Sequence, residues 1–223
     1  MADLFTELAR HDTPTIANAI QGLGIRPATD GFTRPPVHAV FDSLPAIVGR
    51  AVTLTITSTD PFDDAAAERE AMLPLYDVVA SIDGPKIVVV QDTDQGPGCL
   101  WGEVNSTICQ AMGALGVVTD GLVRDLNEVG PMGFQYLARG VGVARANTKV
   151  TSTGVPVEVG GVRFRPGDII HADRHGAVVV PDDRIDDVLA GADRVTNREQ
   201  GLLDWVRSDE FDPTQLAERR ARH

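Results

Sequence analysis

The chain has 223 residues, of which 43% are hydrophobic and 23% charged, a size and composition that suit one globular domain with a buried core. Its formal net charge of -12 at pH 7 argues against nucleic-acid binding, because contacts with phosphates require clustered Lys and Arg side chains. The first ten residues lack a secretory-signal pattern, and no apolar run approaches the roughly 18 residues of a membrane span. We therefore expect a single cytoplasmic domain over residues 1–223, with no nucleic-acid or membrane partner.

The chain contains only two cysteines, Cys99 and Cys109. They form neither a C-x-x-C pair nor a spacing with His that is typical of a zinc site. We expect both to be free thiols in a reducing compartment.

The first predicted elements are a helix and a strand. Thr13 as N-cap and Pro14 in the first turn precede an apolar stripe, which predicts a short amphipathic helix ending at Gly22 or Gly24. Residues 49–58 alternate, with β-branched side chains throughout, a pattern typical of a strand.

The next segment combines helical composition with a buried strand. Residues 63–72 have helical composition, and residues 75–82 either extend this helix or form a second one after Pro74. A turn signal at residues 83–85 precedes the continuous apolar run of residues 86–90, which is typical of a strand buried on both faces. We expect this strand to lie at the centre of the sheet.

A β-loop-α-β unit follows. The loop at residues 91–98 is rich in Asp and Gly, and it leads to a helix that ends near Leu115 and then to a strand at residues 116–119. This order favours parallel strands, with ligands bound at their carboxyl ends. Two further short strands are predicted at residues 134–138 and 141–144.

The last part of the chain is predicted to contain an antiparallel region and a long helix. Residues 156–181 alternate on both sides of a Gly160-Gly161 turn, which is typical of a hairpin. Residues 182–207 form an amphipathic helix, with Asp182 and Asp183 as N-cap and first turn. We expect the charged tail to residue 223 to be mobile or to pack on a neighbouring subunit.

The strongest indication of chemistry is the segment GALGVVTDGLVRD, in which an apolar strand ends in a glycine turn that presents Arg124 and Asp125. The Asp125 carboxylate suits a hard divalent cation such as Mg²⁺, which prefers oxygen ligands and keeps several waters. The planar guanidinium of Arg124 suits a carboxylate or enolate oxygen. The alternative is a surface ion pair in a turn, which most isolated Arg-Asp dipeptides form.

A second indication is the loop Gly96-Pro97-Gly98 followed by WGEVN at residues 101–105, which opens the predicted helix. Free backbone N–H groups at a helix start attract an anion, here a substrate carboxylate. The alternative is a tight loop with Trp101 packed in the core, and the motif by itself favours that alternative.

Other polar side chains give weaker indications. His171 and His175, with Asp173 between them, would need a third partner to hold a metal and are more often structural. Asp92 and Asp94 follow the apolar strand, where they either contact metal-bound water or simply keep a loop soluble.

Four segments, TPTIANAI, WGEVN, GVVTDGLVRD and GDIIHADRHGAVVVP, closely resemble the family of 4-hydroxy-4-methyl-2-oxoglutarate aldolase and the regulator of ribonuclease activity A. The resemblance covers about residues 10–200. It implies a three-layer β/β/α, swivelling-domain-like α/β fold with a central mixed sheet and a C-terminal helix, assembled as a homotrimer or hexamer. One departure is Asn18, which stands where many relatives carry Asp.

The resemblance also implies the roles of individual residues. Asp125 matches the family's Mg²⁺ or Mn²⁺ ligand, and Arg124 matches its substrate-binding arginine. In the aldolases a glutamate near the C-terminus reaches the site of a neighbouring subunit, and Glu199 is the nearest match. The residues that match the pyruvate-binding loop are Gly102, Glu103, Val104 and Asn105.

The resemblance implies a divalent-metal-dependent carbon–carbon lyase of the class II type, with Arg124, Asp125 and Glu199 as catalytic residues. The substrate is expected to be a small 2-oxo acid of the 4-hydroxy-4-methyl-2-oxoglutarate or oxaloacetate type, cleaved by retro-aldol reaction or decarboxylation to pyruvate. The only lysines, Lys86 and Lys149, lie outside the matched motifs, which argues against a Schiff-base route. The alternative is a non-catalytic, protein-binding regulator of ribonuclease activity.

Overall fold

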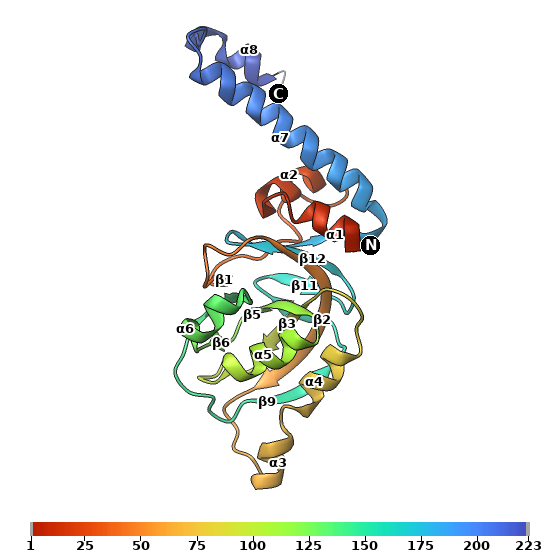
Figure 1. The fold of residues 1–223 in the computed structure, drawn as a ribbon, viewed down its shortest axis with the longest axis vertical. Coiled ribbons are helices and arrows are strands. Elements are labelled where there is room, and N and C mark those ends of the chain that lie inside the picture. Colours follow the sequence, from red (N-terminus) through yellow and green to blue (C-terminus); the bar gives the residue numbers. More distant parts are fainter. Residues whose placement is uncertain (1, 222–223) are drawn as a thin grey trace.

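The computed structural model describes residues 2–221, and eight of its strands form one mixed sheet (Figure 1). These strands are β1 (His38–Ala39), β2 (Ile47–Thr57), β3 (Lys86–Asp92), β5 (Ala114–Thr119), β7 (Gln135–Ala138), β9 (Lys149–Thr153), β12 (Ile169–Asp173) and β13 (Gly176–Val180). Along the sheet the order is β1, β7, β5, β3, β2, β12 and β13. On one edge of β2, β12 pairs with the first half of the strand and β9 with the second half.

Strand β3 has the central position that its continuous apolar run predicts. It pairs in parallel with β2 on one side and with β5 on the other, and β5 pairs in parallel with β7. Its side chains alternate between two apolar cores, because successive residues of a strand point to opposite faces. Val88 and Val90 contribute to one core, and Ile87 and Val89 to the other.

Different layers cover the two faces of the sheet. On one face lie α4 (Leu73–Ala80), α5 (Glu103–Ala111) and the short α6 (Leu126–Val129), whose apolar residues share a core with β2, β3 and β5. On the other face lies the hairpin of β10 (Val157–Val159) and β11 (Val162–Phe164), which turns at Gly160-Gly161 as predicted. The expected β/β/α layers are therefore present.

A third group of helices packs at the β12–β13 end of the sheet. It consists of α1 (Ala2–Leu8), α2 (Thr13–Gly22) and α7 (Ile185–Arg207). Ile16 and Ile20 on α2 and Val188 on α7 are buried against these strands, which accounts for the amphipathic pattern of both helices. No helix within residues 2–221 is long and apolar enough to cross a membrane.

The distal half of α7 extends away from the rest of the chain (Figure 1). The tail turns back along it through α8 (Leu216–Ala221), so residues 208–221 have an ordered contact within their own chain. The Trp205 and Phe211 rings meet edge to face with centroids 5.1 Å apart, and the Arg219 guanidinium lies 4.8 Å from the Trp205 ring centroid. Residues 222 and 223 of the predicted tail lie outside the described residues.

A second sheet, of three parallel strands, is separate from the main sheet. It contains β4 (Cys99–Trp101), β6 (Leu122–Val123) and β8 (Gly140–Val141), in the order β4, β6, β8. The chain reaches β4 from the end of β3 and β6 from the end of β5. The small sheet therefore lies at the carboxyl ends of the two central strands.

Several element boundaries differ from the sequence prediction. The N-cap of α2 is Asp12, whose side chain accepts the Thr15 N–H, so the prediction of Thr13 was one residue too late. The helix predicted from Asp182 begins at Ile185, because residues 182–184 form a separate 3-10 turn. Of the strand predicted at residues 141–144, only Val141 is in a strand.

Other differences concern elements that the prediction omitted or extended. The predicted helix after Gly102 ends at Ala111, earlier than expected, and β5 begins at Ala114. The loop at residues 91–98 leads first into β4 and only then into α5. No sequence pattern predicted α1, β4 or β9. Both cysteines are free, as predicted, and both are buried.

Two glycine-to-alanine substitutions should have opposite effects on stability. A Cβ atom at Gly116 would lie 2.5 Å from the Gln135 carbonyl oxygen on the paired strand, so Gly116→Ala should destabilise the fold by about 1–3 kcal/mol. Gly201 on α7 has no atom within 4 Å of such a Cβ, and Gly201→Ala should stabilise by about 0.5–1 kcal/mol. Urea unfolding of both variants measures the difference, and an equal effect of the two would contradict this packing.

Candidate active site

Parallel pairing of β4 and β6 brings the two sequence motifs together. Trp101 is in register with Val123, and the Arg124 N–H donates to the Trp101 carbonyl oxygen at 2.9 Å. The residues that follow the two strands must then lie side by side at the same edge. Gly102 and Glu103 therefore adjoin Arg124 and Asp125, although 22 residues separate Glu103 from Asp125 in the chain.

The Asp125 carboxylate lies at the start of α5. Its Oδ2 accepts the Glu103 N–H at 3.0 Å, and its side chain is 31% exposed. Asp125 has a left-handed backbone with φ of 59°, a conformation that Asp tolerates better than most residues. The N-terminus of a helix carries a partial positive charge, which attracts the negative charge of a carboxylate at this position.

Gly102 allows this close approach because it has no side chain. A Cβ atom there would lie 2.3 Å from Asp125 Oδ2 and 3.2 Å from Arg124 Cγ. Gly102 is the N-cap of α5 and has an extended backbone, so the requirement for glycine is steric and not conformational. Its role is to let the carboxylate reach the Glu103 amide.

Arg124 faces a cleft of about 270 Å³ beside these residues. Its Nε lies 3.8 Å from Asp125 Oδ2, and within residues 2–221 this buried nitrogen has no hydrogen-bond partner. An unsatisfied buried donor is costly and is usually paired by a ligand or water. The cleft is lined by Met72, Tyr76, Cys99, Leu100, Gly102, Val104, Asn105, Arg124 and Arg145.

The first turn of α5 offers backbone donors to this cleft. The N–H groups of Val104 and Asn105 have no partner among the described residues, as expected for the first turn of a helix. The Asn105 side chain, in contrast, is already engaged, because it donates to the Leu100 carbonyl at 2.6 Å and accepts from the Tyr76 hydroxyl at 2.7 Å. Asn105 can therefore offer its amide N–H, while its side chain holds the loop.

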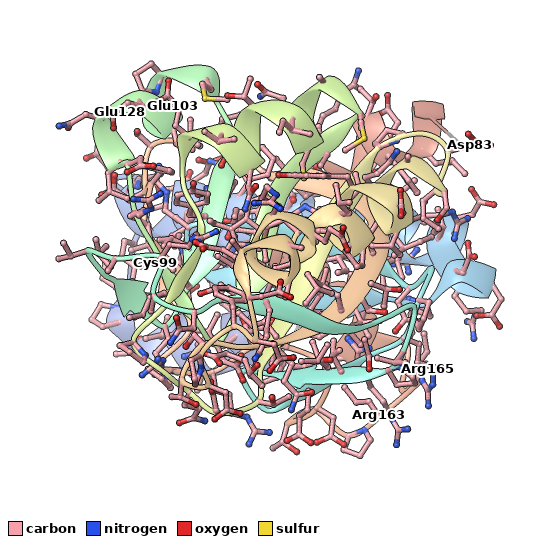
Figure 2. All side chains as sticks on the ribbon, turned by 90° about the horizontal axis from the view of Figure 1, so that it is seen from below. Asp83, Cys99, Glu103, Glu128, Arg163 and Arg165 are labelled. Carbon is pink, nitrogen blue, oxygen red and sulfur yellow. The ribbon has the colours of Figure 1, made fainter. Side chains whose placement is uncertain are left out.

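Several side chains at this edge are exposed to solvent. Glu103 projects outward, as does Glu128 near the end of α6 (Figure 2). Val104 is 66% exposed. Glu103 and Val104 thus contribute mainly their backbone to the site.

Among the lining residues that the sequence did not indicate, two have a polar or charged side chain. Arg145 reaches the cleft from the loop after β8, forms an ion pair with Glu68 and lies 5.6 Å from the centre of the Phe62 ring. Tyr76 comes from α4. Neither belongs to a local motif, so only the aromatic and charged residue types themselves could have indicated them.

Glu199 does not reach the site of its own chain. It lies on α7, which packs on α2 at the β12–β13 end of the sheet and extends away from α5 and α6 (Figure 1). Its expected part in a site shared between subunits stays a prediction.

The histidines have structural environments. His171 is fully buried, with Nδ1 2.9 Å from the Thr13 hydroxyl and Nε2 3.1 Å from the His11 carbonyl, and burial lowers its pKa. Asp173 accepts the Thr13 N–H at 2.9 Å and the His175 N–H at 2.8 Å. Within residues 2–221 no group of three or more His, Cys, Asp or Glu side chains is placed to hold a metal ion.

The donors around Asp125 nevertheless fit a hard divalent cation that also binds substrate. Mg²⁺ typically takes one or two protein carboxylates and fills its other positions with water and substrate oxygens. Asp125 Oδ2 accepts one N–H, and Oδ1 has no hydrogen-bond partner among residues 2–221. A single partly exposed carboxylate, with one guanidinium at ion-pair distance, therefore suits an open Mg²⁺ or Mn²⁺ site better than a closed site of protein ligands.

Comparison with known proteins assigns the family. The family model described as RraA-like, Aldolase/RraA, matches residues 13–179, which include the small sheet and both motifs. The chain belongs to this family. The resemblance seen in the sequence is thereby confirmed.

The similar proteins include one with an aldolase name and one with an RraA name. A relative from Halalkalibacterium halodurans, named "Putative 4-hydroxy-4-methyl-2-oxoglutarate aldolase", is 26% identical over 191 residues, which are 85% of this chain and 82% of the relative. The structure of Streptomyces coelicolor RraAS2, described as an unusual member of the RNase ES inhibitor RraA protein family, matches with a TM-score of 0.70 and 26% identity over 89% of this chain and 94% of its own. An uncharacterized protein from Pseudomonas syringae pv. tomato shares the fold, with a TM-score of 0.77, 23% identity and coverage of 100% and 95%.

Gly102→Ala should weaken binding of Mn²⁺ and pyruvate at least tenfold without unfolding the protein, because the new methyl group displaces the Asp125 carboxylate. Calorimetric titration measures the affinity. Gly22→Ala, at a glycine with no atom within 4 Å, is the matched control and should bind like the wild type. Unchanged affinity in Gly102→Ala would show that the approach of Asp125 to Gly102 is not needed.

Proposed function

We propose that this member of the RraA-like family is a divalent-metal-dependent carbon–carbon lyase that cleaves a small 2-oxo acid to pyruvate. The observation that carries the proposal is the convergence at one cleft of about 270 Å³ of an ionisable carboxylate, a guanidinium whose Nε has no hydrogen-bond partner among residues 2–221, and free backbone N–H groups. This volume suits a small acid. The aldolase name of the Halalkalibacterium halodurans relative supports the same reaction class.

Each protein group has a distinct part in the proposed reaction. The N–H groups of Val104 and Asn105 bind the substrate carboxylate, since a helix start attracts anions. Asp125 holds Mg²⁺ or Mn²⁺, which supplies Lewis-acid stabilisation when bound. Arg124 donates to the 2-oxo oxygen as negative charge develops on it, because the electron pair of the breaking C3–C4 bond forms the enolate of pyruvate. The other fragment leaves as a second pyruvate, once the 4-hydroxyl group has lost its proton, or as CO2. Fixed donors of this kind are usually the largest single contribution to catalysis.

The environments of the two lysines support a route without a Schiff base. Lys86 lies at the amino end of β3, opposite to the cleft, and its Nζ donates to the Met112 carbonyl oxygen at 2.7 Å. Lys149 donates to the Pro61 carbonyl and lies 5.7 Å from the Phe62 ring centroid. Neither ammonium lines the cleft, whereas a Schiff-base mechanism needs an amine beside the substrate.

Substitution of the two central residues tests the proposal. Asp125→Ala should abolish pyruvate release and leave the fold intact, because a partly exposed loop carboxylate contributes little to packing. Arg124→Lys keeps the charge but loses the planar fork, so kcat/KM should fall about 10²–10³-fold. Pyruvate release is assayed with 4-hydroxy-4-methyl-2-oxoglutarate and oxaloacetate, with Mg²⁺, Mn²⁺ or EDTA. Full turnover of every accepted substrate in excess EDTA would refute the metal dependence.

We further propose that the active site is completed between subunits of a homotrimer or hexamer. The motivation is that the distal half of α7 extends away from the rest of its chain. This arm exposes apolar side chains that a neighbouring subunit would cover. Glu199 lies on this helix and would supply the proton that the residues at the cleft lack. The exposed apolar residues of this arm are Leu203, Val206, Phe211 and Leu216.

Mixing two inactive variants tests the shared site. If Asp125→Ala and Glu199→Ala each abolish activity, mixed oligomers should regain a fraction of it, because some interfaces pair an intact Asp125 with an intact Glu199. Native mass spectrometry verifies subunit exchange. Full activity of Glu199→Ala alone, or no recovery after verified exchange, would contradict the shared site.

The alternative function is a protein-binding regulator of ribonuclease activity. It is suggested by the likeness to Streptomyces coelicolor RraAS2 and is compatible with the net charge of -12, which favours a basic partner. The unpaired donors at the cleft favour the enzyme, since a binding surface alone would not need them. Absence of turnover with every 2-oxo acid of the panel, together with tight binding to a ribonuclease, would favour the regulator.

A further inference from the structure

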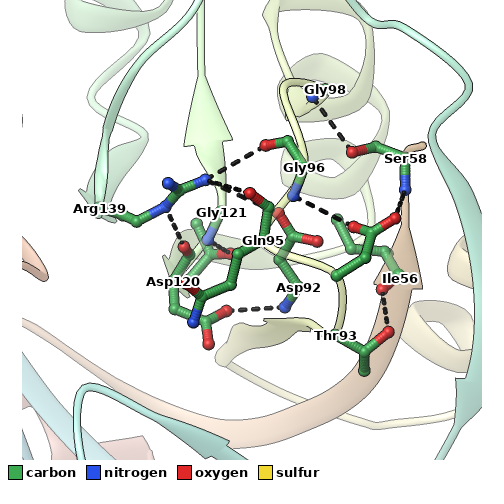
Figure 3. Close-up of polar contacts among 12 residues, drawn as sticks. Ile56, Ser58, Asp92, Thr93, Gln95, Gly96, Gly98, Asp120, Gly121 and Arg139 are labelled. Carbon is green, nitrogen blue, oxygen red and sulfur yellow. Dashed lines mark hydrogen bonds and ion pairs between the residues drawn. The ribbon is translucent and has the colours of Figure 1, made fainter.

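Arg139 joins the segments that lead into the strands of the small sheet. Its Nε donates to the Asp120 carbonyl oxygen at 2.7 Å and its Nη2 to the Gly96 carbonyl oxygen at 3.2 Å (Figure 3). Asp120 lies just before β6 and Gly96 just before β4, while Arg139 itself precedes β8. The Arg139 guanidinium thus links the segments that precede β4 and β6, and Arg139 itself immediately precedes β8.

Asp92 lies beneath this guanidinium at the end of β3. Its side chain is fully buried, and Oδ2 lies 4.0 Å from Arg139 Nη2. Neither carboxylate oxygen has a hydrogen-bond partner within residues 2–221, although the Asp92 N–H donates to Asp120 Oδ1 at 2.7 Å. A buried carboxylate without hydrogen bonds costs stability, so packing alone does not explain Asp92.

We propose that Arg139 and Asp92 are positioning residues of the candidate active site, which hold β4 and β6 so that the Glu103 N–H meets the Asp125 carboxylate. The inference rests on the proposed function and adds two residues to it. Arg139 acts through the backbone carbonyls before the two strands, and the negative charge of Asp92 orients the guanidinium. Neither side chain contacts substrate.

The titration of Asp92 makes this role dependent on pH. Burial raises its pKa to about 7, and the nearby carboxyl groups of Asp94 and Asp120 add to the rise. Arg139 is the cation that faces it, and Glu158 lies farther out beside Asp120. Below about pH 7 the protonated Asp92 no longer attracts Arg139, so the site should become less ordered as the pH falls.

The free energy of unfolding should change with pH in the direction opposite to the order of the site. The folded pKa of Asp92 is above the ordinary value of about 4, so folding favours the protonated form and stability falls as the pH rises from about 4 to 7. Asp92→Asn removes this cost. The variant should therefore melt at a higher temperature than the wild type at pH 8, with a smaller difference at pH 5.

Hydrogen exchange of the Glu103 amide, followed by NMR without substrate, tests the proposal. Arg139→Lys should reduce the protection of this amide about tenfold, because an ammonium cannot donate to both carbonyls in the geometry of the guanidinium. Arg50→Lys is the matched control. Arg50 also donates to a backbone carbonyl, that of Gly167, but it lies in the amino half of β2, away from the small sheet. Unchanged Glu103 protection in folded Arg139→Lys would overturn the inference.

Asp92→Asn keeps the test decisive if Arg139→Lys does not fold. It should reduce Glu103 protection at pH 8 while it raises the melting temperature, and its protection should lose the pH dependence near 7. A merely structural role would lower stability and protection together. Exchange is measured without turnover, so an inactive wild type would refute the proposed function and leave this result to decide the positioning role. If the wild type is active, kcat/KM should fall in both variants.

Discussion

The parallel pairing of β4 and β6 is the constraint on which the candidate site depends. Each strand is only two or three residues long, yet their register fixes which residues emerge next to each other. Once the Arg124 amide bonds to the Trp101 carbonyl, the backbone at Gly102 must adjoin Asp125. The absence of a side chain at Gly102 then lets the carboxylate reach the Glu103 amide. A helix start, a carboxylate and a guanidinium meet through these few contacts.

The main sheet supplies the rigidity that such short strands lack. β3 and β5 are buried on both faces, and the chain passes from their carboxyl ends through loops into the small sheet. Trp101 is fully buried and stacks on Phe134 with ring centroids 5.5 Å apart, which anchors β4 in the core beneath α5. The site therefore sits where well-packed strands end, the usual place for ligand binding in α/β proteins.

Local donors reconcile an acidic chain with the anionic substrate that we propose. The net charge of -12 would repel a 2-oxo acid at long range, but within the cleft the nearest charged groups include Arg124 and Arg145. Screening at physiological salt limits the repulsion to about 8 Å, so the close-range donors dominate binding. The fold alone does not choose between the aldolase and regulator members of the family, because function resides in the site and not in the architecture.

The sequence by itself determined the elements with strong periodicity, among them β2, β3 and α2, and it identified Arg124 and Asp125 as a pair at the end of a strand. It also indicated the family. The very short strands β4, β6 and β8 escaped prediction, apart from Val141, because two or three residues carry no detectable period. Tyr76, Arg139 and Arg145 reach the site region from distant segments. Only tertiary structure decided their places, because strand register and helix packing bring together residues that no local pattern connects.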